Sequence, residues 1–143
     1  MYRLLEVTLT DKESVAIYDT YADKTAMLAD FETKTGQAMK ADAFHAELLV
    51  AFDSVGNIYN QTVISKGEEY SLSPRMLWVQ TKNGEETVEH SKKADANTLE
   101  ADYHIKKGSA MADNTISQIY IMGFDGEEIS ISNFWMRDEP VTE

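Results

Sequence analysis

Arginine, lysine and aspartate residues recur seventy-two positions apart in this chain, and their types could bind a ligand. An arginine and a lysine of each copy, brought together in one cleft, would offer guanidinium and ammonium groups to an anion such as a small nucleotide. In the structural alternative, which we favour, the arginines hold backbone carbonyls and each lysine pairs with an aspartate four residues earlier on a helix. The cations are Arg3, Arg75, Lys34 and Lys106, and the aspartates are Asp30 and Asp102.

The chain contains none of the motifs that mark common catalytic or cofactor sites. It has no cysteine, which excludes disulfides, thiolate metal sites and cysteine nucleophiles. Its three histidines, His45, His90 and His104, lack the spacing of zinc ligands. Glycine-rich phosphate loops and the nucleophile elbow of hydrolases are also absent from the sequence. We therefore expect a non-enzymatic protein without catalytic residues, cofactor or metal.

The charge of the chain is acidic and evenly spread. Residues 1–72 contain twelve acidic and six basic residues and residues 73–143 contain thirteen and seven, so each half contributes −6 to the net charge of −12. Such a charge repels phosphates and disfavours direct nucleic-acid binding, whereas a basic protein surface would be attracted. The alternative, which we favour, is that acidity serves solubility alone. No run of 18 apolar residues and no signal peptide occur, which predicts a cytoplasmic protein without a membrane partner.

The repeated charges belong to a tandem duplication. After a shift of 72 residues, 14 of the 51 positions from 3 to 53 are identical. The pattern Ala-Asp-Phe-x-x-Lys-x-Gly-x-Ala-Met at 29–39 returns at 101–111 with tyrosine in place of phenylalanine. Two copies of one fold are therefore predicted, and the shared positions should serve folding.

Each copy has the pattern of a β-β-α-β-β unit. Alternating apolar residues at 5–9 and 15–18 predict a hairpin, and 76–81 and 86–90 predict another around Asn83-Gly84, the preferred pair for a type I′ turn. Asp23 or Thr25 should cap the first helix. Further strands are predicted over 46–52, 58–64, 116–124 and 129–135. The expected apolar helix positions are Met27, Leu28, Phe31, Ala38 and Met39, and then Leu99, Tyr103, Ala110 and Met111, with Glu100 in place of Leu28.

A glycine interrupts both helical patterns at the same place, Gly36 and Gly108. Glycine inside a helix costs about 1 kcal/mol relative to alanine, so its repetition suggests a shared geometric need. We favour a helix that ends there with a left-handed glycine and continues for one further turn. The alternative is a close approach of the helix to the sheet.

The predicted fold class is α+β, with two tandem β-β-α-β-β repeats that have antiparallel sheets and one helix each and are related by a pseudo-twofold axis. The first repeat spans 1–65, a connector 66–74, the second repeat 75–136 and a loose polar tail 137–143. Because about 70 residues bury little surface alone, the repeats should share a core and form one compact unit. A homodimer of the whole chain is left open.

Residues that differ between the copies are the candidates for partner binding, since the shared residues are needed for the common fold and the others can specialise. The second copy alone has acidic pairs in its hairpin turns, together with two tryptophans, a residue type that binding surfaces concentrate. In the favoured alternative the tryptophans belong to the core. The candidates are Glu85, Glu86, Glu127, Glu128, Trp78 and Trp135.

The segment 28–40, with the strand patterns at 2–8 and 46–50, resembles a group of short phage and prophage proteins of Firmicutes. Those proteins show an aromatic residue followed by lysine, glycine, alanine and methionine at the spacing seen here, in a chain about as long as one repeat. Many have histidine after the aromatic, where this chain has Glu32 and His104. The resemblance covers 1–65 well and 75–135 only through the internal repeat. It implies a mobile-element origin and transfers no functional residue.

A small acidic phage protein without catalytic motifs is expected to act by binding. We expect a stoichiometric inhibitor of a bacterial defence system, present in the cytoplasm of the infected host, that covers a host protein or sequesters a signal molecule. The partner would then be a host or phage protein, with a small nucleotide as an alternative ligand. The competing interpretation is a structural component of the virion or of tail assembly.

Overall fold

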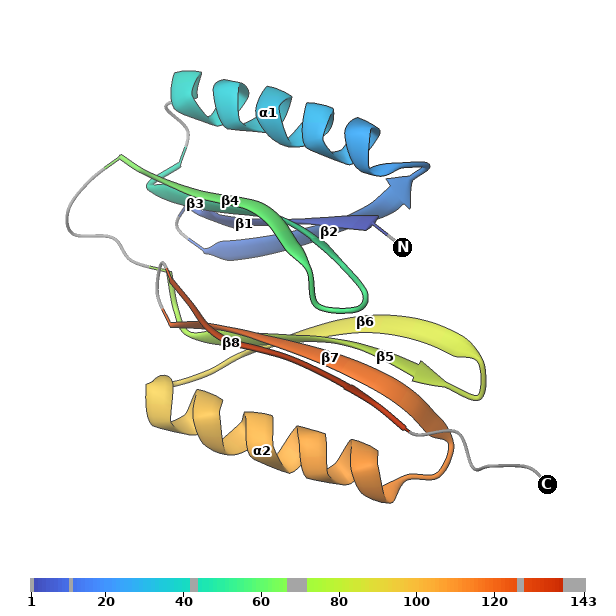
Figure 1. Cartoon of the computed structure of the whole chain (residues 1–143). Coiled ribbons are helices and arrows are strands. Elements are labelled where there is room, and N and C mark those ends of the chain that lie inside the picture. The colour runs from blue at the N-terminus through green and yellow to red at the C-terminus, as the bar shows by residue number, and fades with distance from the viewer. Residues whose placement is uncertain (1, 11, 42–43, 67–71, 126–127, 138–143) are drawn as a thin grey trace. The chain divides into compact units, whose positions relative to one another are not determined.

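The computed structural model describes residues 2–10, 12–41, 44–66, 72–125 and 128–137, which form two units, Met1–Leu72 and Ser73–Glu143 (Figure 1). Glu127, most of the expected connector 66–74 and all of the expected tail 137–143 except Arg137 lie outside the described residues. The expected single compact unit with a pseudo-twofold axis stays a prediction.

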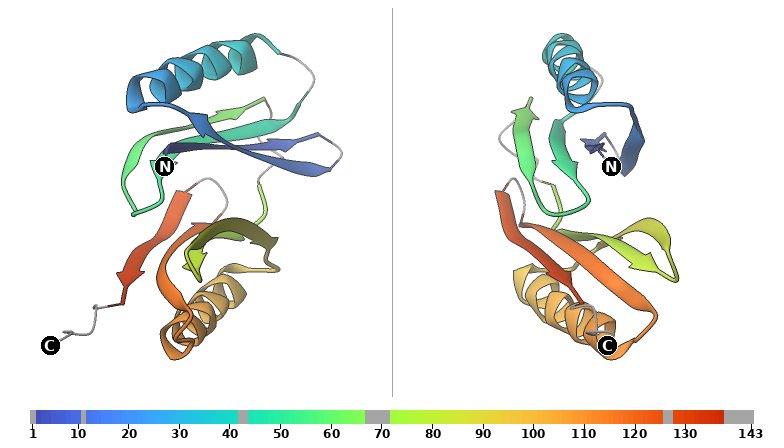
Figure 2. Two further views of the ribbon diagram at one scale, coloured as in Figure 1. Left: turned by 90° about the vertical axis from the view of Figure 1, so that its right-hand side faces the viewer. Right: turned by 45° about the vertical axis from the view of Figure 1, so that its right-hand side comes forward.

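Both units have the predicted β-β-α-β-β order, and in each a helix lies across one face of a four-stranded antiparallel sheet (Figures 1 and 2). The first unit, with strand order β2-β1-β3-β4, consists of β1 (Tyr2–Leu9), β2 (Glu13–Tyr21), α1 (Lys24–Lys40), β3 (Ala46–Asp53) and β4 (Ile58–Ser65). The second, with order β6-β5-β7-β8, consists of β5 (Arg75–Lys82), β6 (Glu85–Lys92), α2 (Ala96–Ala112), β7 (Ile116–Asp125) and β8 (Glu128–Met136). The α+β fold of two repeated units is thus confirmed.

The strand register shows which residues of the two units are equivalent. Ala51 pairs with Asn60, and Gly123, seventy-two residues later, pairs with Ile131. Both pairs are followed by a register shift, after which Phe52 pairs with Ile58 and Phe124 with Ile129. The offset therefore falls from 72 to 71 in the last strand, because the second turn is one residue shorter. Tyr59 and Ser130 are the residues at the shift in each unit.

Turns and helix starts follow the predicted local chemistry. Asn83 and Gly84 have φ angles of 52° and 81°, as a type I′ turn requires. Asp23, of the two candidates, caps α1 by accepting the backbone N–H of Ala26 at 2.7 Å. Asp95 caps α2 in the same way through Thr98. These side chains satisfy N–H groups that have no partner within the helix.

The two helix glycines do not act as predicted. Both helices run without a break through Gly36 and Gly108, neither of which has a positive φ, so the expected left-handed helix end is wrong. A Cβ added at either glycine would have no described atom within 4 Å, which also excludes a close approach to the sheet. Nothing in the structure explains the choice of glycine there.

Each unit has its own cluster of buried side chains between helix and sheet. Helix positions 27, 31 and 38 are buried in the first unit, and Leu99 and Ala110 in the second. Met39 and Met111, expected on the apolar face, are 62% and 47% exposed, because each follows a buried alanine and points about 100° away from it. The clusters consist of Leu4, Met27, Phe31, Leu49 and Ala51, and of Met76, Trp78, Leu99, Ala110, Ile116, Ile119 and Ile121.

Candidate functional site

The repeated helix aspartates anchor each helix to the end of the preceding hairpin, to Tyr21 at the end of β2 and to Lys93 directly after β6. The Tyr21 hydroxyl donates to Asp30, and Lys93, seventy-two residues after Tyr21, donates to Asp102 at 2.6 Å. Burial and then this hydrogen bond raise the pKa of Tyr21. In the described helices neither aspartate forms the expected ion pair with the lysine four residues on, so that expectation is wrong. Each aspartate thus contacts a residue outside its helix in place of the lysine on the same helix.

The repeated lysines cover aromatic rings of the sheet. The Nζ atom of Lys34 lies 4.3 Å from the ring centroid of Tyr18, and that of Lys106 lies 4.4 Å from Trp78. The rings come from different strands, β2 in the first unit and β5 in the second. Both contacts are cation–π interactions within a unit, which gives the two lysines a structural role.

The repeated arginines lie on the other face of each sheet. Leu4 and Met76 face the helices, so their neighbours Arg3 and Arg75 point to the opposite side. Arg3 is 2% exposed and its Nη1 atom lies 3.0 Å from Asp19, while Arg75 is 4% exposed. The arginine and lysine of a unit are thus not brought together, so the described residues do not form the alternative, a cationic cleft, within either unit.

The predicted partner-binding residues have different surroundings. Glu85 and Glu86 are exposed on the edge strand β6, and Glu128 is exposed at the start of β8. Trp78 is 8% exposed and belongs to the core, so the core alternative is confirmed and a surface role for this residue is wrong. Trp135 is partly buried against the same core, with the guanidinium carbon of Arg137 4.9 Å from its ring centroid.

A polar cluster beneath α1 was missed from the sequence. Glu47 is 7% exposed and accepts the Thr8 hydroxyl at 2.9 Å, and the Tyr18 hydroxyl donates to Glu6 at 3.0 Å. Burial is the main cause that raises the pKa of Glu47, and the nearby Glu6 adds to it. The cluster is particular to the first unit, because the second has Trp78 and Ile119 at the positions of the two glutamates.

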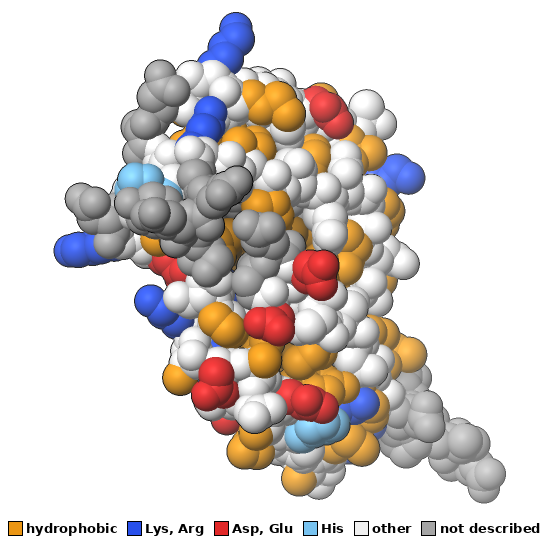
Figure 3. All heavy atoms as spheres, turned by 90° about the vertical axis from the view of Figure 1, so that its left-hand side faces the viewer, with side chains coloured by type: hydrophobic (Ala, Val, Ile, Leu, Met, Phe, Trp, Pro, Cys, Tyr) orange, Lys and Arg blue, Asp and Glu red, His pale blue; other side chains and the backbone are white. Residues whose placement is uncertain are grey.

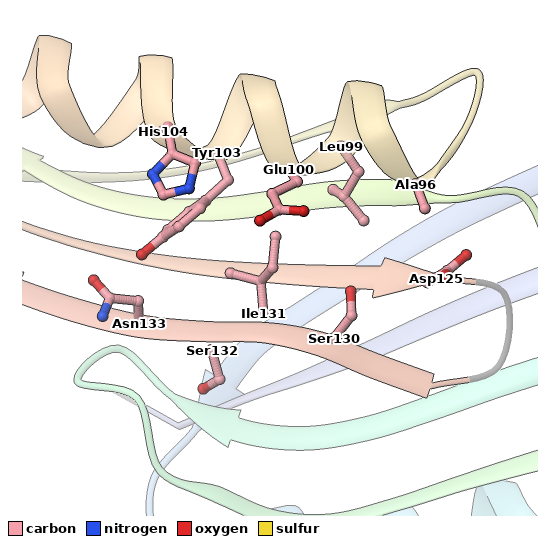
Figure 4. Close-up of a pocket in the computed structure, with 10 residues that line it drawn as sticks. All are labelled: Ala96, Leu99, Glu100, Tyr103, His104, Asp125, Ser130, Ile131, Ser132 and Asn133. Atoms are coloured by element: carbon pink, nitrogen blue, oxygen red, sulfur yellow. The ribbon is translucent and has the colours of Figure 1, made fainter.

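The second unit contains a pocket of about 510 Å³ between α2 and the strands β7 and β8 (Figure 4). Leu99 and Ile131 give it an apolar floor, and Glu100 and Tyr103 project from the helix toward β8. Its volume is within the roughly 300–1,000 Å³ of small-molecule sites. The complete lining is Ala96, Leu99, Glu100, Tyr103, His104, Asp125, Ser130, Ile131, Ser132 and Asn133.

No residue of the pocket was predicted as a site residue. The available signal was a set of three differences on the helix, Ala96 for Lys24, Glu100 for Leu28 and His104 for Glu32. A further difference, Ser130 for Tyr59, becomes visible only when the one-residue change of offset is known from the strand register.

Several kinds of site are not found in the described parts of the chain. These contain no group of histidine, aspartate and glutamate side chains arranged to hold a metal ion, and none of their helices is long and apolar enough to cross a membrane. Comparisons with protein-family models, with curated proteins and with solved structures found no match to this chain.

Proposed function

We propose that this protein is a non-enzymatic binding protein of a phage or related mobile element that inhibits a bacterial defence protein stoichiometrically in the host cytoplasm. One observation carries the proposal: the repeated helix aspartates and lysines make contacts within their own unit, whereas Glu86 and Glu89 of the edge strand β6, which replace Ser14 and Ile17 of the first unit, are exposed. Exposed charge that differs between the units is available to a partner.

The edge strand β6 supports an electrostatic mode of binding. Glu85, Glu86 and Glu89 are all exposed on it, and the chain has a net charge of −12. On the face drawn in Figure 3, acidic side chains lie at several places among basic, hydrophobic and uncharged ones. A basic surface, such as the nucleic-acid channel of a defence protein, would be attracted to β6 and covered by it. Charged side chains on the edge would also prevent unspecific strand pairing.

The proposal is tested by phage plaquing on a defended host that expresses this protein. The wild type should restore plaquing, and Glu85→Lys should reduce the restoration, because it reverses a charge on β6. Glu32→Lys is the matched control, since it makes the same change at an exposed position of α1 in the other unit. Both variants should melt like the wild type.

Two results would overturn this proposal. Restoration that is equal for Glu85→Lys and the wild type, and capture of the partner that does not respond to salt, would exclude the electrostatic mode. A chain found as a stoichiometric part of purified phage particles, without any effect on plaquing, would favour the virion component instead.

A further inference from the structure

The pocket of the second unit lies where the first unit places a tyrosine. In the first unit Tyr59 packs against the core cluster, and its hydroxyl donates to Asp53 at 2.7 Å. Its ring centroid lies 5.9 Å from that of Tyr2 and 5.2 Å from the Nζ atom of Lys24. The ring is thus held by an acceptor at its hydroxyl end, by a second ring and by a cation.

The second unit keeps the acceptor and lacks the ring. Asp125 is equivalent to Asp53, whereas the bulky neighbours are all replaced by smaller or acidic residues. Ser130 replaces Tyr59, according to the register, and Pro74, Ala96 and Glu100 replace Tyr2, Lys24 and Leu28. Ala96, Glu100 and Ser130 all line the pocket, so much of its space arises from these replacements. Ile131, in place of Asn60, takes up part of the space and supplies the apolar floor.

The second unit lacks one donor of the first, because Ser130 stands in place of Tyr59, whose hydroxyl donates to Asp53. Asp53 accepts the backbone N–H groups of Val55 and Asn57, the Asn57 amide and the Tyr59 hydroxyl. Among the residues that the structure describes, none donates a hydrogen bond to the side chain of Asp125 or of Glu100. Two carboxylates therefore face a partly apolar pocket, with acceptor capacity that a ligand could use.

We propose that this pocket binds a small aromatic molecule that carries a hydroxyl group and a cationic amine, of the class of hydroxyphenyl-alkylamines. The ring would lie on Leu99 and Ile131, in the place of the Tyr59 ring. The hydroxyl would donate to Asp125, as Tyr59 does to Asp53, and the ammonium group would pair with Glu100. Glu100 provides the preference for a cation, since the first unit has the apolar Leu28 at this position and its own lysine near the ring.

This ligand site is separate from the partner surface proposed above, because none of the residues that line the pocket lies on β6. Titration of the full chain with tyramine, followed by calorimetry and by amide NMR shifts, tests it. Tyramine should bind with shifts centred on the residues of the pocket. Phenethylamine, which lacks the hydroxyl, and 4-hydroxyphenylacetate, which replaces the cation by an anion, should each bind about ten-fold more weakly or worse.

Two variants return the pocket to the form of the first unit. Ser130→Tyr should fill it and abolish tyramine binding. Glu100→Leu should lower tyramine affinity about ten-fold and leave the weak binding of neutral p-cresol unchanged. If Ser130→Tyr does not fold, the tyramine affinity of Glu100→Leu is decisive by itself. The absence of tyramine binding at millimolar concentration, equal binding of tyramine and 4-hydroxyphenylacetate, or unchanged tyramine binding to Glu100→Leu would each overturn the proposal, whatever the plaquing result.

Discussion

The guanidinium of Arg137 lies against the C-terminal end of α2, where its Nη2 atom donates to the carbonyl oxygen of Asp113 at 2.9 Å. The same atom reaches Ala110 and Met111, and Nε reaches the carbonyl oxygen of Ile116. Lys66 is the equivalent residue of the first unit and donates to Met39 at the end of α1 at 2.8 Å. Both cations therefore donate to carbonyl oxygens at the end of a helix, which is the negative end of its dipole.

Arg137→Ala should lower the free energy of unfolding of the second unit by about 1–2 kcal/mol, because several carbonyl oxygens lose a charged donor. Lys66→Ala should cost the first unit less, about 0.5 kcal/mol, since it removes one such contact. Urea unfolding measures the first effect by tryptophan fluorescence, because both tryptophans belong to the second unit, and the second by circular dichroism. Equal, negligible losses in the two variants would show that neither cap matters.

The change in register explains why this pair could not be predicted from the sequence. A constant shift of 72 aligns Lys66 with Asp138, so the equivalence of Lys66 and Arg137 is hidden by the shorter second turn. The sequence pattern accordingly places Arg137 in a loose tail, which is wrong. The elements themselves could be predicted, because the hydrophobic alternation, the Asn83-Gly84 turn and the Asp23 cap act through neighbouring residues.

Contacts between distant elements could not be predicted in this way. The spacing of Asp30 and Lys34 favours a local ion pair. In the fold, however, the Tyr21 hydroxyl lies close to Asp30 and donates a hydrogen bond to it. The pocket depends on three replacements, at 96, 100 and 130, that only the folded sheet brings to one place. Sequence patterns therefore predicted which elements form, whereas side-chain partners depended on the packing of helix against sheet.

Gly36→Ala and Gly108→Ala should each stabilise the protein by up to about 1 kcal/mol, since both glycines lie inside continuous helices with open space at the Cβ position. Thermal and urea unfolding, followed by circular dichroism, measure the gain. Gly84→Ala is the control and should destabilise, because Gly84 has a φ of 81°. A loss of stability in both helix variants would indicate that the glycines serve a need that the helix geometry does not reveal.

Glu47 should make the stability of the first unit depend on pH. Its pKa is raised in the folded protein, chiefly by burial, so the folded state holds the proton to higher pH than the unfolded chain. The stabilising effect of the proton is complete below the unfolded pKa, near 4.5, and is lost as pH rises through the folded pKa. Glu47→Gln should therefore be more stable than the wild type at neutral pH, and this advantage should shrink toward pH 4.

Urea unfolding of the wild type and of Glu47→Gln across pH 4 to 8, followed by circular dichroism, measures this difference. The glutamine can still accept the hydrogen bond from Thr8. Glu89→Gln, at an exposed position of β6, is the control and should not show the same pH-dependent gain. A Glu47→Gln protein that is less stable than the wild type at every pH would mean that the charged form of Glu47 is favourable in the fold.

The equivalence of Lys93 and Tyr21 predicts that the two donors can be exchanged. Lys93→Tyr should keep a hydrogen bond to Asp102, as Tyr21 makes to Asp30, and should unfold like the wild type. Lys93→Leu should cost about 0.5–1 kcal/mol, since Asp102 loses its partner while its side chain, 35% exposed, keeps access to water. Tryptophan fluorescence in urea, at low and high salt, separates these cases. The wild type should be more stable than Lys93→Leu at low salt, and this difference should fall as salt is added, because its contact with Asp102 is ionic. The difference in stability between Lys93→Tyr and Lys93→Leu should persist at high salt. A Lys93→Tyr protein as unstable as Lys93→Leu would show that the two units do not use this position alike.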